Sequence, residues 1–355
     1  MKRPADLVRP EILASQAYPV ADSAGMVKLD AMELPYRLPE ALRRRLAERL
    51  AEAEIHRYPD PTGTKLREQL ARKMNVPAGI ELMLGNGSDD LIQIITFALA
   101  RPGTTMLIPE PTFVVYQMNA SLSGMRLACV PLRDDFALDR DAFLAKVGEV
   151  RPALVYLAYP NNPTGALYPE ADIEAILRAS DGLVVLDEAY HAYAGKSFMR
   201  RLPEFPNLAV MRTVSKLGLA GIRLGYLAAH PPWIEQFNKV RQVYNVSVLT
   251  QLAAQFALEH LEVLEEQAGK VLAERPGVGK ALAALPGVTV FPSAANFFLI
   301  RVPDADRLSE RLKKQGVLVR NFNGAHRLLA NCLRVTVGTP EENRILLSAM
   351  REGLK

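Results

Sequence analysis

The sequence predicts an α/β fold in which a large, mostly parallel sheet carries helices on both faces and a smaller α/β unit follows. Between residues 80 and 230, short β-rich runs alternate with longer helical runs, which is the pattern of βα units. Several of the short runs are apolar throughout, as expected for strands buried on both faces of a parallel sheet. A shorter alternation of the same kind follows from residue 288 and predicts the smaller unit.

The composition excludes several classes of protein. The chain has 355 residues, 49% hydrophobic and 23% charged, which is typical of a soluble globular protein and excludes disordered and low-complexity chains. The 43 Lys and Arg and 39 Asp and Glu residues are scattered, so nucleic-acid binding is not predicted. The longest apolar stretch, residues 91–100, is half a membrane span, and the first residues lack the apolar run of a signal peptide. We therefore expect a soluble, cytoplasmic protein without a membrane or nucleic-acid partner.

The two cysteines, Cys129 and Cys332, are far apart in the sequence. They predict neither a disulfide framework nor a thiolate zinc site. We expect no bound metal.

The elements of the first two thirds can be placed in order. Residues 1–37 contain several prolines and little periodicity, which predicts an extended N-terminal arm. An amphipathic helix follows, because Leu42, Leu46 and Leu50 recur every four residues. It ends before the turn at 58–63. The predicted strands of the large sheet are residues 80–84, 105–109, 154–158, 183–186, 210–214 and 224–228.

The last third predicts the smaller unit. Apolar residues over 250–274 indicate a long helix that bridges the domains and is broken at Pro276-Gly277. Strands are expected at 288–291, 297–300, 317–319 and 333–337, with helices at 308–315 and 341–350. The chain length allows two domains of about 150 residues or one large domain with an appendage. We favour the second, with an N-terminal arm at 1–37 that packs partly on the small domain, a large ligand-binding domain at 38–260 and a small C-terminal domain at 261–355.

Three predicted strands end in chemically distinctive residues. Ligands bind at the carboxyl ends of strands in open parallel sheets, so these residues are expected to share a site. They are Asn162 after the first strand, Asp187 and Tyr190 after the second, and Ser215, Lys216 and Arg223 after the third. Each segment alone can also be explained by structure without function, as a turn, a helix cap or a solvated lysine. Together they supply the amine, carboxylate, hydroxyl donors and anion site that pyridoxal phosphate requires.

A further phosphate site is predicted at Leu84-Gly85-Asn86-Gly87-Ser88-Asp89-Asp90, where a strand, a two-glycine turn and an apolar helix follow one another. The backbone N–H groups of the first helical turn would face the phosphate. The segment lacks the third glycine of a dinucleotide fingerprint and the Gly-Lys-Ser/Thr of a P-loop. The two aspartates are expected to complement the helix dipole.

Five motifs in this order, RYPDPTGTKLRE, GNGSDD, PNNPTG, DEAY and SKLGLAGIRLGY, resemble the fold type I, pyridoxal-phosphate-dependent aminotransferases of class I and II. The segments LDAMELPY and LRVTVGTPEEN narrow the resemblance to the histidinol-phosphate aminotransferases. The similarity runs from about residue 29 to the end of the chain. It implies transfer of an amino group from histidinol phosphate to 2-oxoglutarate, giving imidazole acetol phosphate and glutamate, in histidine biosynthesis.

The resemblance also implies roles for single residues. Lys216 would form the Schiff base and move the proton, Asp187 would pair with the pyridine nitrogen, and Tyr190 would join them as a catalytic residue. The cofactor-binding residues would be Gly87, Ser88, Asp89, Phe113 (stacked on the ring), Asn162, Asp187, Tyr190, Thr213, Ser215, Lys216 and Arg223. Tyr58 would reach the cofactor phosphate of a neighbouring subunit, which implies a homodimer with shared active sites. The substrate would be held by Arg334 at its anionic end, with Arg320, Tyr36 and Asn162 as further contacts.

Three other functions stay open at this point. An aromatic amino-acid aminotransferase would share every cofactor residue and differ only around the N-terminal arm and Arg320. A threonine-phosphate decarboxylase would use the same scaffold and release carbon dioxide. A non-catalytic regulator with this fold is the least expected, because such proteins usually add a DNA-binding domain or lose the lysine, and Lys216 is present.

Overall fold

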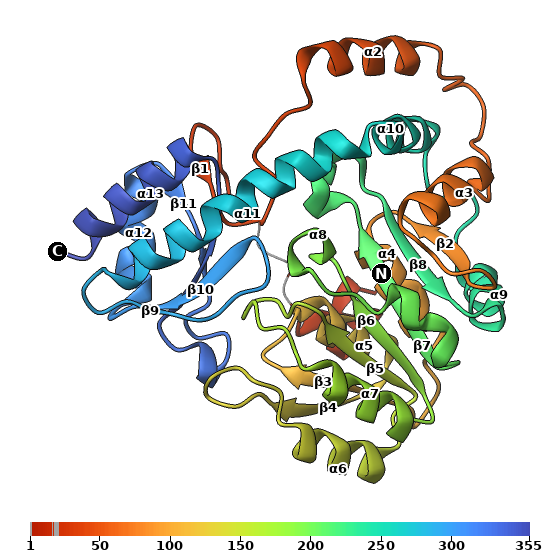
Figure 1. The fold of residues 1–355 in the computed structure, drawn as a ribbon. Coiled ribbons are helices and arrows are strands. Elements are labelled where there is room, and N and C mark those ends of the chain that lie inside the picture. The colour runs from red at the N-terminus through yellow and green to blue at the C-terminus, as the bar shows by residue number, and fades with distance from the viewer. Residues whose placement is uncertain (1, 16, 18–20) are drawn as a thin grey trace.

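The computed structural model describes residues 2–15, 17 and 21–355. Among these residues it contains a seven-stranded sheet, a four-stranded sheet and a two-stranded pair, with helices packed around them (Figure 1). The predicted α/β fold class is therefore confirmed. Residues 1, 16 and 18–20 of the predicted arm lie outside the described residues.

The large sheet brings the ends of its strands to one edge. Its order is β2-β8-β7-β6-β5-β3-β4. The strands are β2 (Glu81–Gly85), β3 (Thr105–Glu110), β4 (Arg126–Pro131), β5 (Leu154–Ala158), β6 (Leu183–Asp187), β7 (Leu208–Thr213) and β8 (Gly225–Ala229). Strands β3 to β7 are parallel, whereas β8 is antiparallel to both β2 and β7. Since β2 thus runs in the direction of β7, the carboxyl ends of β2, β5, β6 and β7 lie at the same edge.

The six strands predicted for this sheet are confirmed, with boundaries that differ by no more than two residues. Strand β4 was not predicted. It lies at the edge of the sheet, and only Val130 of its six residues is buried. An edge strand with so few buried residues lacks the continuous apolar run that marks the central strands.

Helices cover both faces of the large sheet. Apolar side chains of α4 (Ser88–Leu99), α5 (Val114–Ser123) and α9 (Pro231–Val240) pack against one face. Those of α3 (Thr64–Lys73), α6 (Arg140–Val150) and α7 (Glu170–Ala179) pack against the other. This second core continues through α10 (Val248–Glu259) and α11 (Leu261–Ala283) into the smaller sheet. Figure 1 shows α11 running from α10 to the side of the smaller sheet.

The smaller part is an antiparallel sheet with two helices and a contribution from the arm. Its strand order is β12-β13-β10-β9, formed by β9 (Thr289–Val290), β10 (Phe297–Arg301), β12 (Arg320–Asn321) and β13 (Cys332–Thr336). Helices α12 (Ala305–Lys314) and α13 (Pro340–Gly353) pack beside it. In the arm, β1 (Val27–Lys28) pairs in parallel with β11 (Val317–Leu318).

The remaining elements are short helical turns and one peripheral helix. The turns are η1 (Pro4–Asp6), α1 (Pro10–Leu13), α8 (His191–Ala194), η2 (Met199–Glu204), η3 (Ser215–Leu217), η4 (Ala220–Ile222) and η5 (Arg327–Leu329). The predicted amphipathic helix is α2 (Glu40–Ala51), which stands apart from most of the molecule in Figure 1.

The predicted break at Pro276-Gly277 is wrong. Pro276 lies inside α11, which runs without interruption over 23 residues; the sequence-predicted helix is instead divided at His260, between α10 and α11. A proline inside a helix costs about 3 kcal/mol. The buried side chains of Leu264 and Val271 before it and Leu282 after it outweigh that cost, because each fully buried aliphatic side chain stabilises by roughly 2 kcal/mol.

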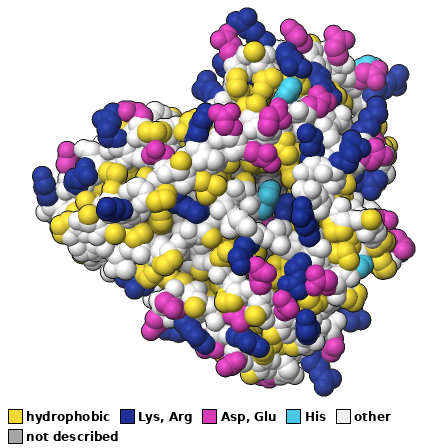
Figure 2. Space-filling model, in the orientation of Figure 1, with side chains coloured by type: hydrophobic (Ala, Val, Ile, Leu, Met, Phe, Trp, Pro, Cys, Tyr) yellow, Lys and Arg dark blue, Asp and Glu magenta, His cyan; other side chains and the backbone are white. Residues whose placement is uncertain are grey.

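In the part of the chain that the structure describes, no helix combines the length and the apolar character needed to cross a bilayer. Figure 2 shows Lys and Arg side chains interspersed with Asp and Glu over one face of the molecule.

Candidate active site

A cavity of about 120 Å³ lies at the carboxyl edge of the large sheet. It is lined by Met32, Ala158 and Ala189 and by ten residues predicted from the sequence: Ser88, Asp89, Phe113, Asn162, Asp187, Tyr190, Thr213, Ser215, Lys216 and Arg223. These residues come from the arm, the starts of α4 and α5 and the segments after β5, β6 and β7. The strand directions of the sheet thus gather side chains that are far apart in the sequence.

The N-terminus of α4 is a candidate anion site, and its close packing depends on two glycines. Gly87 has a φ of +84°, and a Cβ there would lie 2.5 Å from a terminal nitrogen of Arg223. A Cβ on Gly225 would lie 2.7 Å from the backbone nitrogen of Ser88. Arg223 also donates a hydrogen bond to Oγ of Ser215 at 3.2 Å. Helix N–H groups, a guanidinium and hydroxyls that converge in this way suit a phosphate.

The side-chain amine of Lys216 is buried, and its pKa is lowered. It lies on η3 directly after β7, and its Nζ donates a hydrogen bond to the backbone oxygen of Ala31 at 2.7 Å. Burial, and next the positive charge of Arg334, lowers the pKa of Lys216 from 10.5 to about 8. A much larger share of this amine is therefore unprotonated near neutral pH than of an ordinary lysine, and only the unprotonated form is a nucleophile.

Asp187 is a buried carboxylate at the end of β6. Its side chain is 4% exposed and accepts hydrogen bonds from the Tyr116 hydroxyl at 2.6 Å and the Ala189 backbone N–H at 3.1 Å. Burial raises the pKa of Asp187 to about 6, while the hydrogen bond from Tyr116 acts in the opposite direction. At pH 7 the carboxylate is mostly ionised and can pair with a cationic group in the cavity.

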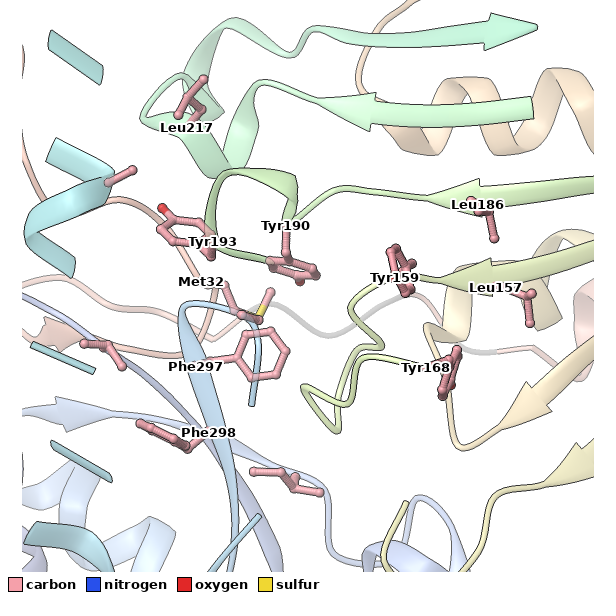
Figure 3. Close-up of a cluster of buried hydrophobic side chains, with 14 of the residues drawn as sticks. Met32, Leu157, Tyr159, Tyr168, Leu186, Tyr190, Tyr193, Leu217, Phe297 and Phe298 are labelled. Carbon is pink, nitrogen blue, oxygen red and sulfur yellow. The ribbon is translucent and has the colours of Figure 1, made fainter. Parts of the chain in front are cut away.

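Asn162 and Tyr190 form part of the wall. The Asn162 Oδ1 accepts a hydrogen bond from Arg334 at 2.5 Å. The Tyr190 ring packs edge to face against Phe297, with centroids 5.2 Å apart. Met32 lies beside these two rings in Figure 3. The Thr213 hydroxyl donates a hydrogen bond to Oγ of Ser215 at 2.8 Å. This bond holds Ser215 in place at the candidate anion site.

A larger cavity of about 480 Å³ adjoins the first, since Met32, Phe113 and Asn162 line both. Arg320 and Arg334 line the larger one. The Arg334 guanidinium lies 5.5 Å from the Phe297 ring centroid and 5.3 Å from that of Phe322. This cavity can therefore take a molecule that carries an anionic group and an apolar or aromatic part.

Two predicted site residues lie elsewhere in this chain. Tyr58 is 80% exposed and stacks on Tyr244, with centroids 4.4 Å apart. Tyr36 lies under the ammonium group of Lys270, 5.7 Å from its ring centroid. Neither tyrosine lines one of the two cavities, so their predicted contacts with a partner's cofactor and with the substrate stay predictions.

Sequence reasoning missed Met32, Tyr116 and the backbone oxygen of Ala31. Met32 and Ala31 lie in the segment LDAMELPY, whose one predicted site residue is Tyr36. Tyr116 lies two residues after the Pro-Thr-Phe-Val segment that contains Phe113. No local signal marks it, because its contact with Asp187 spans 71 residues.

The residues of the smaller cavity fit pyridoxal phosphate. Because Gly87 has no Cβ, the Arg223 guanidinium can approach the N-terminus of α4 closely. Lys216 and Asp187 line the same cavity, and Phe113 forms another wall. The smaller cavity therefore brings together an amine, a carboxylate, an aromatic ring and a guanidinium that could pair with a phosphate, which is the donor set that this cofactor needs.

Comparisons with known proteins agree with this geometry. Residues 24–350 match the family aminotransferase class I and II. The chain is 57% identical over 354 residues to histidinol-phosphate aminotransferase 1 of Ralstonia nicotianae, covering 98% of this chain and 95% of that one. It is 56% identical to histidinol-phosphate aminotransferase 2 of Cupriavidus pinatubonensis, covering 98% and 97%. The structure resembles that of histidinol-phosphate aminotransferase from Sinorhizobium meliloti in complex with pyridoxal-5'-phosphate, with a TM-score of 0.87, 27% identity and coverage of 98% and 97%.

Proposed function

Because the chain belongs to the class I and II aminotransferases, we propose that it is a pyridoxal-phosphate-dependent transaminase that converts histidinol phosphate and 2-oxoglutarate into imidazole acetol phosphate and glutamate, in histidine biosynthesis. Its curated relatives at 57% and 56% identity are named for this activity. The observation that carries the proposal is that Lys216, Asp187 and the anion site at α4 line one cavity while Arg334 lines the next.

Most residues of the smaller cavity have a task in this reaction. When bound, pyridoxal phosphate supplies a conjugated ring that stabilises negative charge on the substrate Cα. Lys216 Nζ would condense with the cofactor's aldehyde, with loss of water; once the substrate amine displaces it, the freed Nζ would move the proton that leaves that carbon. Asp187 keeps the ring nitrogen protonated, since an ionised carboxylate beside it stabilises the cation. Ring-hydroxyl contacts come from Asn162 and Tyr190. The phosphate would be held by the backbone N–H groups of Gly87, Ser88 and Asp89 and by the side chains of Thr213, Ser215 and Arg223.

The larger cavity binds the substrate. The planar guanidinium of Arg334 can pair with a phosphate in one half of the reaction and with a carboxylate in the other. Its neighbours Phe297 and Phe322 suit a flat ring. Arg320 lines the same cavity and is the second candidate for the anionic end.

An aromatic amino-acid aminotransferase is the second candidate function. The larger cavity has several apolar walls, among them Phe113, Met118 and Phe322, which would also accept a phenyl ring. The names of the relatives favour histidinol phosphate over an aromatic amino acid as the substrate. They also favour amino-group transfer over the decarboxylation of threonine phosphate. The placement of Lys216 in the cavity argues against a non-catalytic regulator.

We further propose a homodimer with shared active sites. Helix α2 buries no side chain completely, although it carries three regularly spaced leucines. Beyond it, Ile55 is 73% exposed and Tyr58 is 80% exposed. Exposed apolar side chains of this kind are typical of a protein interface. A second copy that covers them would receive Tyr58 at its cofactor phosphate.

The proposal also covers the domain boundaries and the cellular location. We divide the chain into an arm, a large domain at 38–260 and a small domain at 261–355, supported by the boundary between α10 and α11 at His260. We place the enzyme in the cytoplasm, since Cys129 and Cys332 are free thiols and a reducing compartment preserves thiols.

The test uses the purified protein with pyridoxal phosphate. We expect a visible absorbance that borohydride bleaches and that is lost in Lys216→Ala, together with glutamate formed faster from histidinol phosphate than from phenylalanine. A bleachable absorbance that survives in Lys216→Ala would refute the assignment of the lysine. Faster turnover of phenylalanine would leave the cofactor in place and replace the substrate, and carbon dioxide release would identify a decarboxylase.

A further inference from the structure

Tyr116 is a fully buried tyrosine that contacts the carboxylate of Asp187. Its side chain is 0% exposed, and its hydroxyl donates to Oδ2 of Asp187 at 2.6 Å. The other oxygen, Oδ1, accepts the backbone N–H of Ala189 at 3.1 Å. With one hydrogen bond on each oxygen, the plane of the carboxylate is held in a single orientation.

The sheet and the rings around Tyr116 fix this contact. Side chains alternate along a strand, so Asp187 lies on the same face of β6 as Val185, which belongs to the core beneath α4, α5 and α9. Tyr116 enters that core from α5. Its ring stacks on Tyr156 with centroids 4.5 Å apart and an interplanar angle of 2°, and it meets the edge of Phe113 at 5.6 Å.

We propose that Tyr116 is a positioning residue, whose hydroxyl keeps Asp187 ionised and aimed at the cofactor's ring nitrogen and whose ring supports Phe113. This inference rests on the proposed function, because it assumes that pyridoxal phosphate binds in the smaller cavity. The phenol acts through Asp187 and lines neither of the two cavities itself.

The surroundings of Asp187 explain why a donor is needed there. Asp187 is buried, and the nearby carboxylates of Asp89 and Glu188 raise its pKa further. A hydrogen bond to the charged form opposes both effects. Burial, and next the charge of Asp187, raises the pKa of Tyr116 well above 10. The phenol therefore stays protonated, and continues to donate, well above neutral pH.

Removing this hydroxyl weakens the bond between Asp187 and the ring nitrogen. A hydrogen bond to a charged group is among the stronger ones in proteins, and its loss corresponds to about a ten- to a hundredfold change in an equilibrium constant. We expect Tyr116→Phe to raise the dissociation constant of the apoenzyme for pyridoxal phosphate by that factor.

A double-mutant cycle separates positioning from packing. Tyr116→Phe, Asp187→Asn and the double variant are prepared as apoenzymes, and their affinity for pyridoxal phosphate is measured by fluorescence titration. If Tyr116 acts through Asp187, the Tyr116→Phe substitution changes the affinity less than about threefold once Asp187 is Asn. An equal loss in both backgrounds, or no loss in the single variant, would overturn the proposal.

A matched control and a spectroscopic readout complete the test. Tyr156→Phe removes the hydroxyl from the other ring of the stacked pair, where it donates only a long hydrogen bond of 3.4 Å to the Ile92 oxygen, and it is expected to leave the affinity unchanged. Thermal unfolding of each apoenzyme reports folding separately. The visible absorbance of the bound cofactor, titrated with pH, should shift in Tyr116→Phe and not in Tyr156→Phe. If the wild-type protein gives no visible complex, the proposed function itself is wrong.

Discussion

Arg334 on β13 donates a hydrogen bond of 2.5 Å to Oδ1 of Asn162, which follows β5 and lies 172 residues earlier in the chain. The same guanidinium donates to the backbone oxygen of Asp30 at 2.6 Å. One side chain therefore joins the small sheet, the large sheet and the N-terminal arm. The proposed substrate arginine is held directly against a proposed cofactor contact.

The first prediction concerns this arginine. Arg334→Lys keeps the positive charge but loses the planar fork and the contacts with Phe297 and Phe322. We expect kcat/KM for histidinol phosphate to fall about a hundredfold, roughly 3 kcal/mol, mainly through KM, with a smaller loss of cofactor affinity through Asn162. Steady-state kinetics and a cofactor titration measure the two effects. Arg320→Lys is the comparison, and an unchanged KM in Arg334→Lys would contradict the assignment.

The second prediction tests the anion site at α4. In Gly87→Ala the new Cβ would lie 2.5 Å from Arg223, so the guanidinium must move. We expect the affinity for pyridoxal phosphate to fall at least tenfold, measured by titration of the apoenzyme. Gly103→Ala is the matched control, because Gly103 has a similar φ of +85° but open space around it. The Gly103→Ala variant carries the same backbone strain and should bind the cofactor with the wild-type affinity. Equal losses of affinity in the two variants would show that backbone strain alone is responsible.

The third prediction follows from the pKa of Lys216, which is lowered from 10.5 to about 8 in the folded apoenzyme. Between these two values the unfolded chain binds more protons than the folded one, so stability rises with pH in this window. The free energy of unfolding of the wild type, minus that of Lys216→Met, should increase by about 3 kcal/mol between pH 7.5 and 10.5.

Urea unfolding of the apoenzymes at several pH values measures this difference. Other groups titrate equally in wild type and variant and cancel. Lys314→Met, at an exposed position of α12, is the control for the replacement of a lysine by methionine. A pH-independent difference for Lys216→Met would mean that the amine has an ordinary pKa.

The fourth prediction concerns a buried ion pair behind the site. Glu188 is fully buried and accepts hydrogen bonds from two nitrogens of Arg212, at 2.8 and 2.9 Å. Arg212→Met leaves this carboxylate without its cation and should lower the free energy of unfolding by about 3–5 kcal/mol. Adding Glu188→Gln should restore most of the loss, because the uncompensated charge is then removed. Urea unfolding of both variants measures these free energies. A double variant that is less stable than Arg212→Met would contradict the prediction.

Much of the fold was predictable because its strands are locally distinctive. Strand β5 was predicted with its observed boundaries, since it is apolar throughout and ends at a turn rich in Pro and Asn. The division between α10 and α11 was not predicted, and neither was the continuous helix through Pro276. In both cases the packing of α10 and α11 into the core decided where the helices end, and packing energy has no local sequence signal.

By itself the sequence determined the identity and order of the chemical groups, because the lysine, the carboxylate and the glycine turn each stand at the end of an apolar run. Only the tertiary structure decided which groups touch. Tyr116 reaches Asp187, Ala31 receives the hydrogen bond of Lys216, and Arg334 meets Asn162. These contacts depend on strand direction, sheet register and the placement of the arm, which arise from interactions summed over the whole chain.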